Sequence, residues 1–450
     1  MSIWDAIQAY HDLLTDELAA QSQDWLDEQQ RRHRLSFGSR LLSTVLRPRF
    51  MTLQQYSFLQ DRVRLVMRAF EKAYRAAIAD SGYRAQFGLA DWEEELIRRD
   101  RASTHPSPTS RLDAFYLPDS GTLRFMEYNA EVPAAVAYTD VLSEVFLALP
   151  AMGQFLRLYR AFPLPARHTL LHTLLDSYRQ WSGTRETPRI AIVDWREVPT
   201  YNEFVLFEEY FQSRGIPCII ADPREMEYRN GRLLAGGMHV NLLYKRILTN
   251  ELYYSCGLDH PIVRATLDGS ALSVNSFRCK ILHKKASFAV LSDERNSELF
   301  SPEECQAIEA HIPWTRRVED RYTYYRGQRV DLLPFLLEHK DQFVLKPNDE
   351  YGGKGICLGW HSSVDEWEES LRDALSQPHI VQERLSIPTE PYPSYLDGRL
   401  QYTDRMMDTS PFVFDGSYMD GCLTRLSTHA LLNVTAGGGS TVPTFLVERR

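Results

Sequence analysis

The chain has 450 residues, which is enough for about three domains with substantial buried cores. Hydrophobic residues make up 44% of it and charged residues 25%, the composition of an ordinary globular protein. With a net charge of −9, the chain has no general attraction for nucleic acids or anionic membranes, so we expect neither as a partner.

Targeting signals and cysteine usage indicate the compartment in which the protein is expected. No apolar run approaches the roughly 18 residues that a membrane helix needs, and no signal-peptide pattern opens the chain. The six cysteines are widely scattered and include no CxxC pair, which favours free thiols in a reducing compartment over a disulfide framework or a zinc site. We therefore expect a cytoplasmic enzyme.

The first hundred residues are expected to be helical. Val63, Val66 and Phe70 recur at intervals of three and four, which is the spacing of a buried helix stripe. A polar, proline-containing break over residues 103–110 ends this region. We expect a helical N-terminal region over residues 1–105.

A pair of strands is expected next, over residues 113–117 and 122–128, joined by the turn-forming sequence PDSG. Polar residues two positions apart share one face of a strand, and two such pairs occur here: Arg111 with Asp113, and Glu127 with Asn129. Two carboxylates and an amide oxygen suit a hard cation such as Mg²⁺ held beside nucleotide phosphates. A solvent-exposed sheet face of alternating polar residues is the alternative.

Helical sequence returns between residues 139 and 181, and a βαβ unit is expected over residues 189–222. The helix of this unit carries a stripe of phenylalanines. No GxGxxG lies between its strands, so we expect no dinucleotide site there. The strands expected in this part of the chain are residues 190–193, 216–220 and 242–248.

Two neighbouring lysines, Lys284 and Lys285, open a helix-like run in LHKKASFAVL. Either amine could neutralise phosphate charge, and spacing alone leaves open which of the two would face a site. A solvated pair of surface charges is the alternative.

The most informative segment is residues 343–360, FVLKPNDEYGGKGICLGW. An apolar strand brings in Lys346, and a second apolar run over residues 356–358 returns from a glycine-rich turn. Lysine amines and unhindered backbone N–H groups are what a triphosphate needs, and glycine lets the backbone approach it closely. The turn residues expected to bind nucleotide are Tyr351, Gly352, Gly353, Lys354 and Gly355. A plain β-hairpin turn is the competing interpretation.

Two further segments carry candidate site residues. The strand in HIVQERL ends in polar residues that could meet an adenine and a ribose, namely Gln382, Glu383 and Arg384; a strand that frays into solvent is the alternative. Arg425 could stabilise transferring phosphoryl charge, or it could be a surface strand residue. Glycines 437–439 suggest an anion-binding or lid loop, with a disordered surface turn as the alternative.

Together these residues resemble the ATP-grasp superfamily of ATP-dependent ligases in its circularly permuted form, as in glutathionylspermidine synthetase and the bacterial type 2 proteins. In an unpermuted chain the nucleotide lysines precede the metal-binding block, whereas RLD and EYN precede the lysines here. The KP-loop-GGxG segment, the QE pair, G-x-LTR and N-x-x-x-GGG match the same pattern. The resemblance covers the chain from residue 110 to its end.

The resemblance implies an α/β (α+β) fold, a circularly permuted ATP-grasp domain with a small Rossmann-like pre-ATP-grasp domain and a helical N-terminal region. Four parts are expected. They are the helical region 1–105, the metal-binding part with helices 106–185, the Rossmann-like domain 186–275, and the nucleotide-binding region with its glycine-rich lid 276–450.

The resemblance also implies an ATP- and Mg²⁺-dependent carboxylate–amine ligase that forms an amide or peptide bond through an acyl phosphate. The implied roles are phosphate binding for Lys346 with Lys284 or Lys285, metal binding for Asp113, Glu127 and Asn129, and charge stabilisation for Arg111 and Arg425. Small-molecule or peptide carboxylates and amines would be the substrates; their identity and the oligomeric state stay open. The rival hypotheses are an ATP-dependent phosphotransferase and a catalytically decayed nucleotide-binding scaffold.

Overall fold

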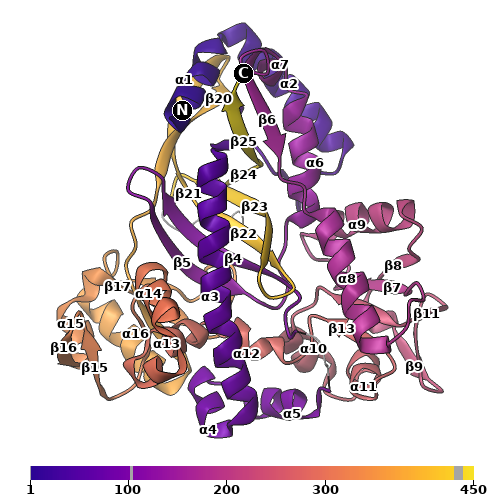
Figure 1. Ribbon diagram of the computed structural model, residues 1–450, viewed down its shortest axis with the longest axis vertical. Coiled ribbons are helices and arrows are strands. Elements are labelled where there is room, and N and C mark those ends of the chain that lie inside the picture. The colour runs from indigo at the N-terminus through magenta and orange to yellow at the C-terminus, as the bar shows by residue number, and fades with distance from the viewer. Residues whose placement is uncertain (1, 102–104, 430–438) are drawn as a thin grey trace.

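A computed structural model describes residues 2–101, 105–429 and 439–450 of the chain. Within them, the fold is mixed α/β and is built around a seven-stranded antiparallel sheet in the order β20-β21-β23-β22-β4-β5, with β24 beside β23 (Figure 1). Its strands are β4 (Thr109–Leu117), β5 (Thr122–Asn129), β20 (Thr389–Leu396), β21 (Arg399–Met407), β22 (Ser410–Phe414), β23 (Tyr418–Ser427) and β24 (Ser440–Val442). Distant parts of the chain therefore meet in this sheet.

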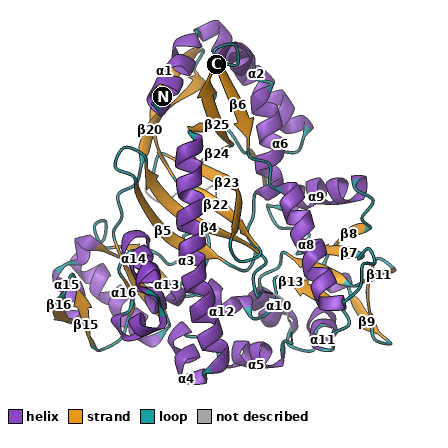
Figure 2. Ribbon diagram, viewed as in Figure 1, coloured by secondary structure: helices purple, strands orange, loops and turns teal. Residues whose placement is uncertain are grey.

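Helix α3 (Leu53–Ala79) crosses the face of the central sheet (Figure 2). At its start, Thr52 and Gln55 accept hydrogen bonds from each other's backbone N–H groups, which satisfies donors that a helix otherwise leaves unpaired. Its predicted apolar stripe is buried, and the Phe70 and Tyr128 ring centroids lie 4.8 Å apart. The other helices of the predicted N-terminal region are α1 (Ile3–Leu13), α2 (Asp16–Arg32), α4 (Ser81–Arg84) and α5 (Asp91–Arg99).

Short strands interrupt the regions predicted to be helical. β3 (Arg49–Met51) pairs in parallel with β25 (Thr444–Arg449), whose other edge pairs with β6 (Tyr159–Pro163). The prediction of helix throughout residues 139–181 is therefore wrong at β6. Because its partner lies hundreds of residues away, local periodicity contains no sign of it. Also in these regions lie β1 (Ser36–Phe37), β2 (Arg40–Leu41), α6 (Val136–Leu147), α7 (Pro150–Phe155) and α8 (Arg167–Ser182).

The predicted βαβ unit is confirmed as part of a four-stranded parallel sheet in the order β13-β12-β7-β8. The third predicted strand ends at Lys245 and not at residue 248, because the chain turns there toward a helix. The strands are β7 (Ile190–Val193), β8 (Cys218–Ala221), β12 (Leu242–Lys245) and β13 (Leu272–Val274), with α9 (Tyr201–Ser213), α10 (Thr249–Cys256) and α11 (Pro261–Leu267). A small antiparallel sheet beside them holds β9 (Glu227–Arg229), β10 (Arg232–Ala235) and β11 (Met238–Val240).

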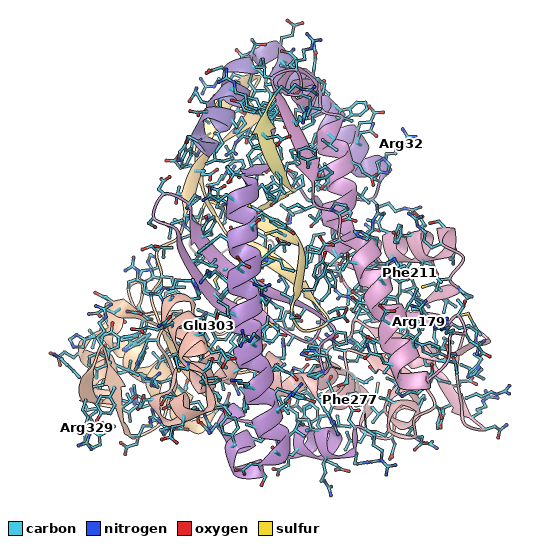
Figure 3. The ribbon with its side chains drawn as sticks, viewed as in Figure 1. Arg32, Arg179, Phe211, Phe277, Glu303 and Arg329 are labelled. Carbon is cyan, nitrogen blue, oxygen red and sulfur yellow. The ribbon has the colours of Figure 1, made fainter. Side chains whose placement is uncertain are left out.

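The glycine-rich segment forms the predicted hairpin within a second four-stranded sheet, in the order β14-β19-β17-β18. Trp367 anchors this unit: it is fully buried, and its Nε1 donates to the Leu336 carbonyl at 3.0 Å. Arg329 on this unit and Phe211 on the parallel-sheet unit lie on opposite sides of α3 (Figure 3). The strands of this sheet are β14 (Thr315–Arg317), β17 (Phe343–Pro347), β18 (Cys357–Leu358) and β19 (His379–Glu383). A separate antiparallel pair, β15 (Tyr322–Tyr325) and β16 (Gln328–Asp331), contributes to the same apolar core.

Helices cover this second sheet and connect it to the rest. These are α12 (Cys279–His283), α13 (Ala286–Ser292), α14 (Pro302–His311), α15 (Leu332–Glu338) and α16 (Val364–Ser376), with 3₁₀ turns at Ala85–Phe87, Pro223–Glu225, Glu294–Leu299 and Lys340–Gln342. One apolar core contains residues from Ile3 to Val447, so it draws on all four expected parts of the chain. The expected limits of those parts stay a prediction. Within the described ranges, no helix combines the length and apolar character that crossing a bilayer requires.

The buried carboxylate of Glu131, two residues beyond β5, joins these units. Its Oε1 accepts from Lys245 Nζ at 2.9 Å and from the Thr249 backbone N–H at 2.7 Å, and its Oε2 lies 3.4 Å from Lys280 Nζ. Burial opposes ionisation of this carboxyl, but Lys245 and Lys280 outweigh burial and hold the pKa of Glu131 well below its usual range. The β4–β5 hairpin is thereby fixed against the parallel sheet and α12.

We predict that Glu131→Gln lowers the free energy of unfolding by about 3–5 kcal/mol at pH 7, because Lys245 and Lys280 would lose a buried counter-charge. The folded pKa of Glu131 lies below its unfolded value. Its stabilisation is therefore complete above about pH 4.3 and is lost as the pH falls through the folded pKa. Urea unfolding should show a difference between variant and wild type that shrinks in acid.

Glu448→Gln is the matched control. Glu448 pairs with Arg160 at 3.2 Å on the surface, where both side chains are more than half exposed. Losing that pair should cost less than about 1 kcal/mol. Equal losses in the two variants would contradict the role given to Glu131.

Candidate functional site

The register of β4 and β5 brings four predicted polar residues together. Arg111 pairs with Asn129, and Asp113 pairs with Glu127, across the antiparallel ladder. Directly opposed residues on one face have Cβ atoms about 5 Å apart, so the four side chains gather as the hairpin prediction requires. Arg111 and Asp113 are buried, which rules out a fully solvent-exposed face. The strand itself begins at Thr109, inside the stretch predicted as a break.

Asp113 lies between two arginines. Its Oδ1 is 2.7 Å from Arg111 Nε, and its Oδ2 is 2.6 Å from Nη2 of Arg425 on β23. Burial opposes ionisation, but the two guanidinium groups outweigh it and lower the pKa of Asp113 far below its usual range. Arg425 therefore lies beside Asp113 with 19% of its side chain exposed, so its interpretation as a surface strand residue is wrong.

Two lysines lie close to the acid pair, Asp113 and Glu127. Lys285 Nζ is 2.8 Å from Glu127 Oε1; burial opposes ionisation of Glu127, but Lys285 outweighs it and lowers the pKa of Glu127. Lys346 Nζ donates to Gln382 Oε1 at 2.7 Å and to the Met126 carbonyl at 3.3 Å. Burial lowers the pKa of Lys346 to about 8, so this amine is easily discharged.

The neighbouring lysines at the junction of α12 and α13 have different partners. Lys284 Nζ lies 2.8 Å from Glu93 Oε1 and 3.0 Å from Asp349 Oδ2, whereas Lys285 meets Glu127. Both lysines are buried, so the alternative of solvated surface charges is wrong. Of the two amines, only that of Lys285 forms an ion pair with a member of the acid pair, Glu127.

The loop between β17 and β18 keeps its backbone accessible. Gly352, Gly353 and Gly355 have φ angles of 65°, 78° and 70°, a left-handed conformation that favours glycine. Tyr351 donates from its hydroxyl to a carboxylate on α10 at 3.1 Å, which holds the loop toward the parallel-sheet unit. Lys354 has 77% of its side chain exposed, and its amine lies 3.6 Å from Glu350 Oε2.

One cavity unites most of the predicted residues. Gln382 is buried in β19, a central strand, so the alternative of a strand that frays into solvent is wrong. Arg384 stacks over the Trp360 ring with its guanidinium carbon 4.3 Å from the centroid. The polar lining is Asp113, Glu127, Lys346, Gly352, Gly353, Gln382, Glu383, Arg384 and Arg425. The apolar lining includes Val344, Ile356, Leu358, Trp360, Leu385 and Ile387.

A larger cleft runs along α3 and holds none of the predicted residues. Its charged side chains are already paired, for example Lys72 with Glu304 at 2.6 Å and Arg75 with Glu71 at 2.6 Å. The cavity beside β17 is smaller, but it combines two opposed carboxylates, a lysine and an arginine with an apolar slot. We therefore take the cavity beside β17 as the candidate site.

The residues predicted to supply oxygen donors for a metal ion are Asp113, Glu127 and Asn129, and this assignment stays a prediction. Among the residues described, no three His, Cys, Asp or Glu side chains gather as a metal cluster, so the set depends on the Asn129 amide oxygen. Mg²⁺ is commonly held by one or two carboxylates plus substrate phosphates and waters, which this donor set fits. Nδ2 of Asn129 is buried without a hydrogen-bond partner; as a donor, it suits a phosphate oxygen and not a metal ion.

Sequence analysis missed two buried carboxylates that support the site. Glu131 continues the alternation of Glu127 and Asn129, and that spacing could have marked it. Asp408 is a single acid in a turn and carries no comparable signal; it lies against Arg425. Of the glycines predicted to form a C-terminal loop, 437 and 438 lie outside the described residues.

Comparisons with known proteins show the fold and a distant sequence similarity. No protein-family model matches the chain. A solved glutathione synthetase-like effector, GSS30 of Globodera pallida, has a similar fold, with a TM-score of 0.62 at 14% identity, covering 96% of this chain and 98% of that one. At this identity the likeness concerns the fold alone.

Two curated bacterial proteins are similar in sequence. The chain is 24% identical over 344 residues to the "putative glutamate–cysteine ligase 2-2" of Frankia casuarinae, covering 72% of this chain and 36% of that protein. It is also 24% identical over 353 residues to the "putative glutamate–cysteine ligase 2-3" of Frankia alni, covering 74% and 38%. The chain thus spans little more than a third of either relative, and shares its fold with a glutathione synthetase-like protein.

Proposed function

We propose that this chain is an ATP- and Mg²⁺-dependent ligase that joins a carboxylate to an amine, built on a circularly permuted ATP-grasp fold. The observation that carries the proposal is the cavity in which the acid pair of β4 and β5 meets Lys346, Gln382 and Arg425. The names of the two curated relatives and of the structural neighbour support the same class of reaction.

The nucleotide would lie along β17 and β19. Lys285 and Lys346 would neutralise phosphate charge, and the glycine loop would offer backbone N–H groups to the phosphate oxygens. The apolar slot beside Trp360 would take the adenine, with Gln382 and Glu383 at its polar edge. Lys284 would act indirectly, since its amine is bound to Glu93 and Asp349.

Asp113, Glu127 and Asn129 would hold Mg²⁺, which when bound neutralises phosphate charge and orients the phosphates for transfer. Arg111 and Arg425 both contact Asp113 and are permanently charged. They would therefore stabilise negative charge on the phosphoryl group as it moves.

The reaction would proceed in two steps. A substrate carboxylate would attack the γ-phosphorus of ATP, releasing ADP and forming an acyl phosphate. An amine would then attack the acyl carbon, forming the amide and expelling phosphate. The loop that carries Tyr351 would exclude water, because an exposed acyl phosphate hydrolyses. The substrates would be a small-molecule or peptide carboxylate and amine.

Calorimetric titration with a non-hydrolysable ATP analogue, with and without Mg²⁺, tests the nucleotide site. We expect binding that strengthens in Mg²⁺, followed by ADP release and an amide product in a screen over amino acids, peptides and polyamines. A phosphorylated product without an amide would point to a phosphotransferase. Absence of nucleotide binding would favour a scaffold protein.

Glu127→Ala should abolish ADP release while the protein stays folded, because Glu127 supplies one of only two carboxylates in the proposed metal set. Thermal unfolding and steady-state ADP release are the measurements. Glu448→Ala, on the surface, is the matched control and should retain full turnover. If Glu127→Ala retained ADP formation, the metal assignment would be wrong.

Lys346→Met should weaken nucleotide affinity about tenfold or more, since it removes a partly buried cation from the phosphate subsite. In the wild type, affinity should also fall as the pH rises above about 8, because the neutral amine must take up a proton to pair with phosphate. That pH dependence should be absent in the variant. Lys72→Met, outside the cavity, is the control. Unchanged affinity in Lys346→Met would mean that the triphosphate binds elsewhere.

A further inference from the structure

Asp408, in the turn between β21 and β22, makes an unusually complete set of contacts with Arg425. The residue is fully buried. Its Oδ2 lies 2.6 Å from Arg425 Nε and 2.5 Å from Nη2, and its Oδ1 accepts the Arg425 backbone N–H at 2.7 Å. The Asp408 backbone N–H in turn donates to the Arg425 carbonyl at 3.1 Å. Both residues are thus locked to each other through backbone and side chain.

This arrangement leaves the guanidinium almost no freedom to rotate. The Nε–Nη2 edge is held by Asp408, and Nη2 also reaches Asp113 Oδ2 at 2.6 Å, whereas Nη1 takes part in neither contact. Arg425 lines the cavity that also holds Asp113 and Glu127. A planar fork held along one edge presents its remaining N–H groups in one fixed direction.

Burying a carboxylate costs desolvation free energy unless the carboxylate is paired. The Asp408 carboxylate is paired with Arg425, and the same contacts fix the orientation of the guanidinium. Among the charged residues that line the cavity, the hydrogen bonds and ion pairs described for Asp408 go to Arg425, while its carboxylate repels that of Asp113. Arg425 Nη2 lies between the two carboxylates, so the bonded path from Asp408 to the cavity passes through Arg425.

We propose that Asp408 is a positioning residue that holds the Arg425 guanidinium in the orientation needed to stabilise the transferring phosphoryl group. The inference rests on the proposed function and deepens it, because it assigns the orientation of Arg425 to a residue that touches neither substrate nor metal. When Asp113 turns to another partner, the bonds to Asp408 keep Arg425 in place. Preorganised charge of this kind lowers a barrier without reorganisation during the reaction.

Asp408→Asn tests the inference, because it keeps the side-chain shape and removes the charge. We expect ADP release to slow about 10²-fold with nucleotide affinity nearly unchanged. Calorimetry gives a readout besides activity: affinity for Mg²⁺-ADP with aluminium fluoride, which mimics the transferring phosphoryl group, should fall by a similar factor, while affinity for Mg²⁺-ADP alone stays constant. Arg425→Lys should slow the reaction too. The double variant should be no slower than Arg425→Lys alone, because residues that act as one unit are not additive.

Asp140→Asn is the matched control. Asp140 is another buried aspartate paired with an arginine, Arg167, at 3.3 Å, and it lies outside the cavity. It should lose thermal stability without any change in the aluminium fluoride affinity. If Asp408→Asn does not fold, Asp408→Glu replaces it, because the longer side chain keeps the charge and displaces the guanidinium. The affinities for Mg²⁺-ADP with and without aluminium fluoride are then compared in the same way.

The outcomes separate the two proposals. If the wild type binds no nucleotide and releases no ADP, the proposed function is wrong, and so is this inference, which depends on it. If the wild type turns over and a folded Asp408 variant matches it in rate and in aluminium fluoride affinity, the inference alone is overturned. A loss in the double variant equal to the product of the single losses would also overturn it, since Asp408 would then act independently of Arg425.

Discussion

The buried ion pairs around Glu131 are the interaction on which the arrangement of the site depends. The carboxylate binds Lys245 on the parallel sheet and Thr249 on α10, while Lys280 reaches both Glu131 and Asp349 at the start of the glycine loop. None of these charges could be buried alone without a large cost. These ion pairs therefore fix the β4–β5 hairpin, the parallel sheet and the glycine loop relative to one another, at the place where their polar side chains meet.

Two cations at the site are paired with its two carboxylates. Lys285 faces Glu127 and Arg425 faces Asp113, so these two cations each have a counter-charge within hydrogen-bond distance, whereas the Lys346 amine meets neutral oxygens of Gln382 and Met126. Under the proposed function, a polyphosphate with its metal ion could take over both partners at once, the cations turning to phosphate and the carboxylates to the metal. Such an exchange leaves no buried charge uncompensated, which explains how a site this charged is compatible with a stable fold.

Much of the site is predictable because its elements have strong local patterns. The turn sequence PDSG and the alternation around it define the β4–β5 hairpin, but the register set by that turn would pair Asp113 with Met126. A β-bulge between Asp113 and Ala114 shifts the pairing by one residue, so that Asp113 lies opposite Glu127. The phenylalanine stripe of α9 and the apolar runs beside it define the βαβ unit in the same way. The strands β3 and β6 cannot be predicted in this way, because each is short and pairs with β25, which lies far away at the C-terminal end of the chain.

By itself, the sequence determines which chemical groups are available and which local elements carry them: the acid pair, the lysine before the glycine loop, and the polar end of β19. Only the tertiary structure decides that Lys285 and not Lys284 meets Glu127, and that Asp408 lies behind Arg425. The first depends on how the junction of α12 and α13 packs. The second depends on strands that pair across the central sheet. Contacts of this kind join residues far apart in the chain, so periodicity over a few residues contains no record of them.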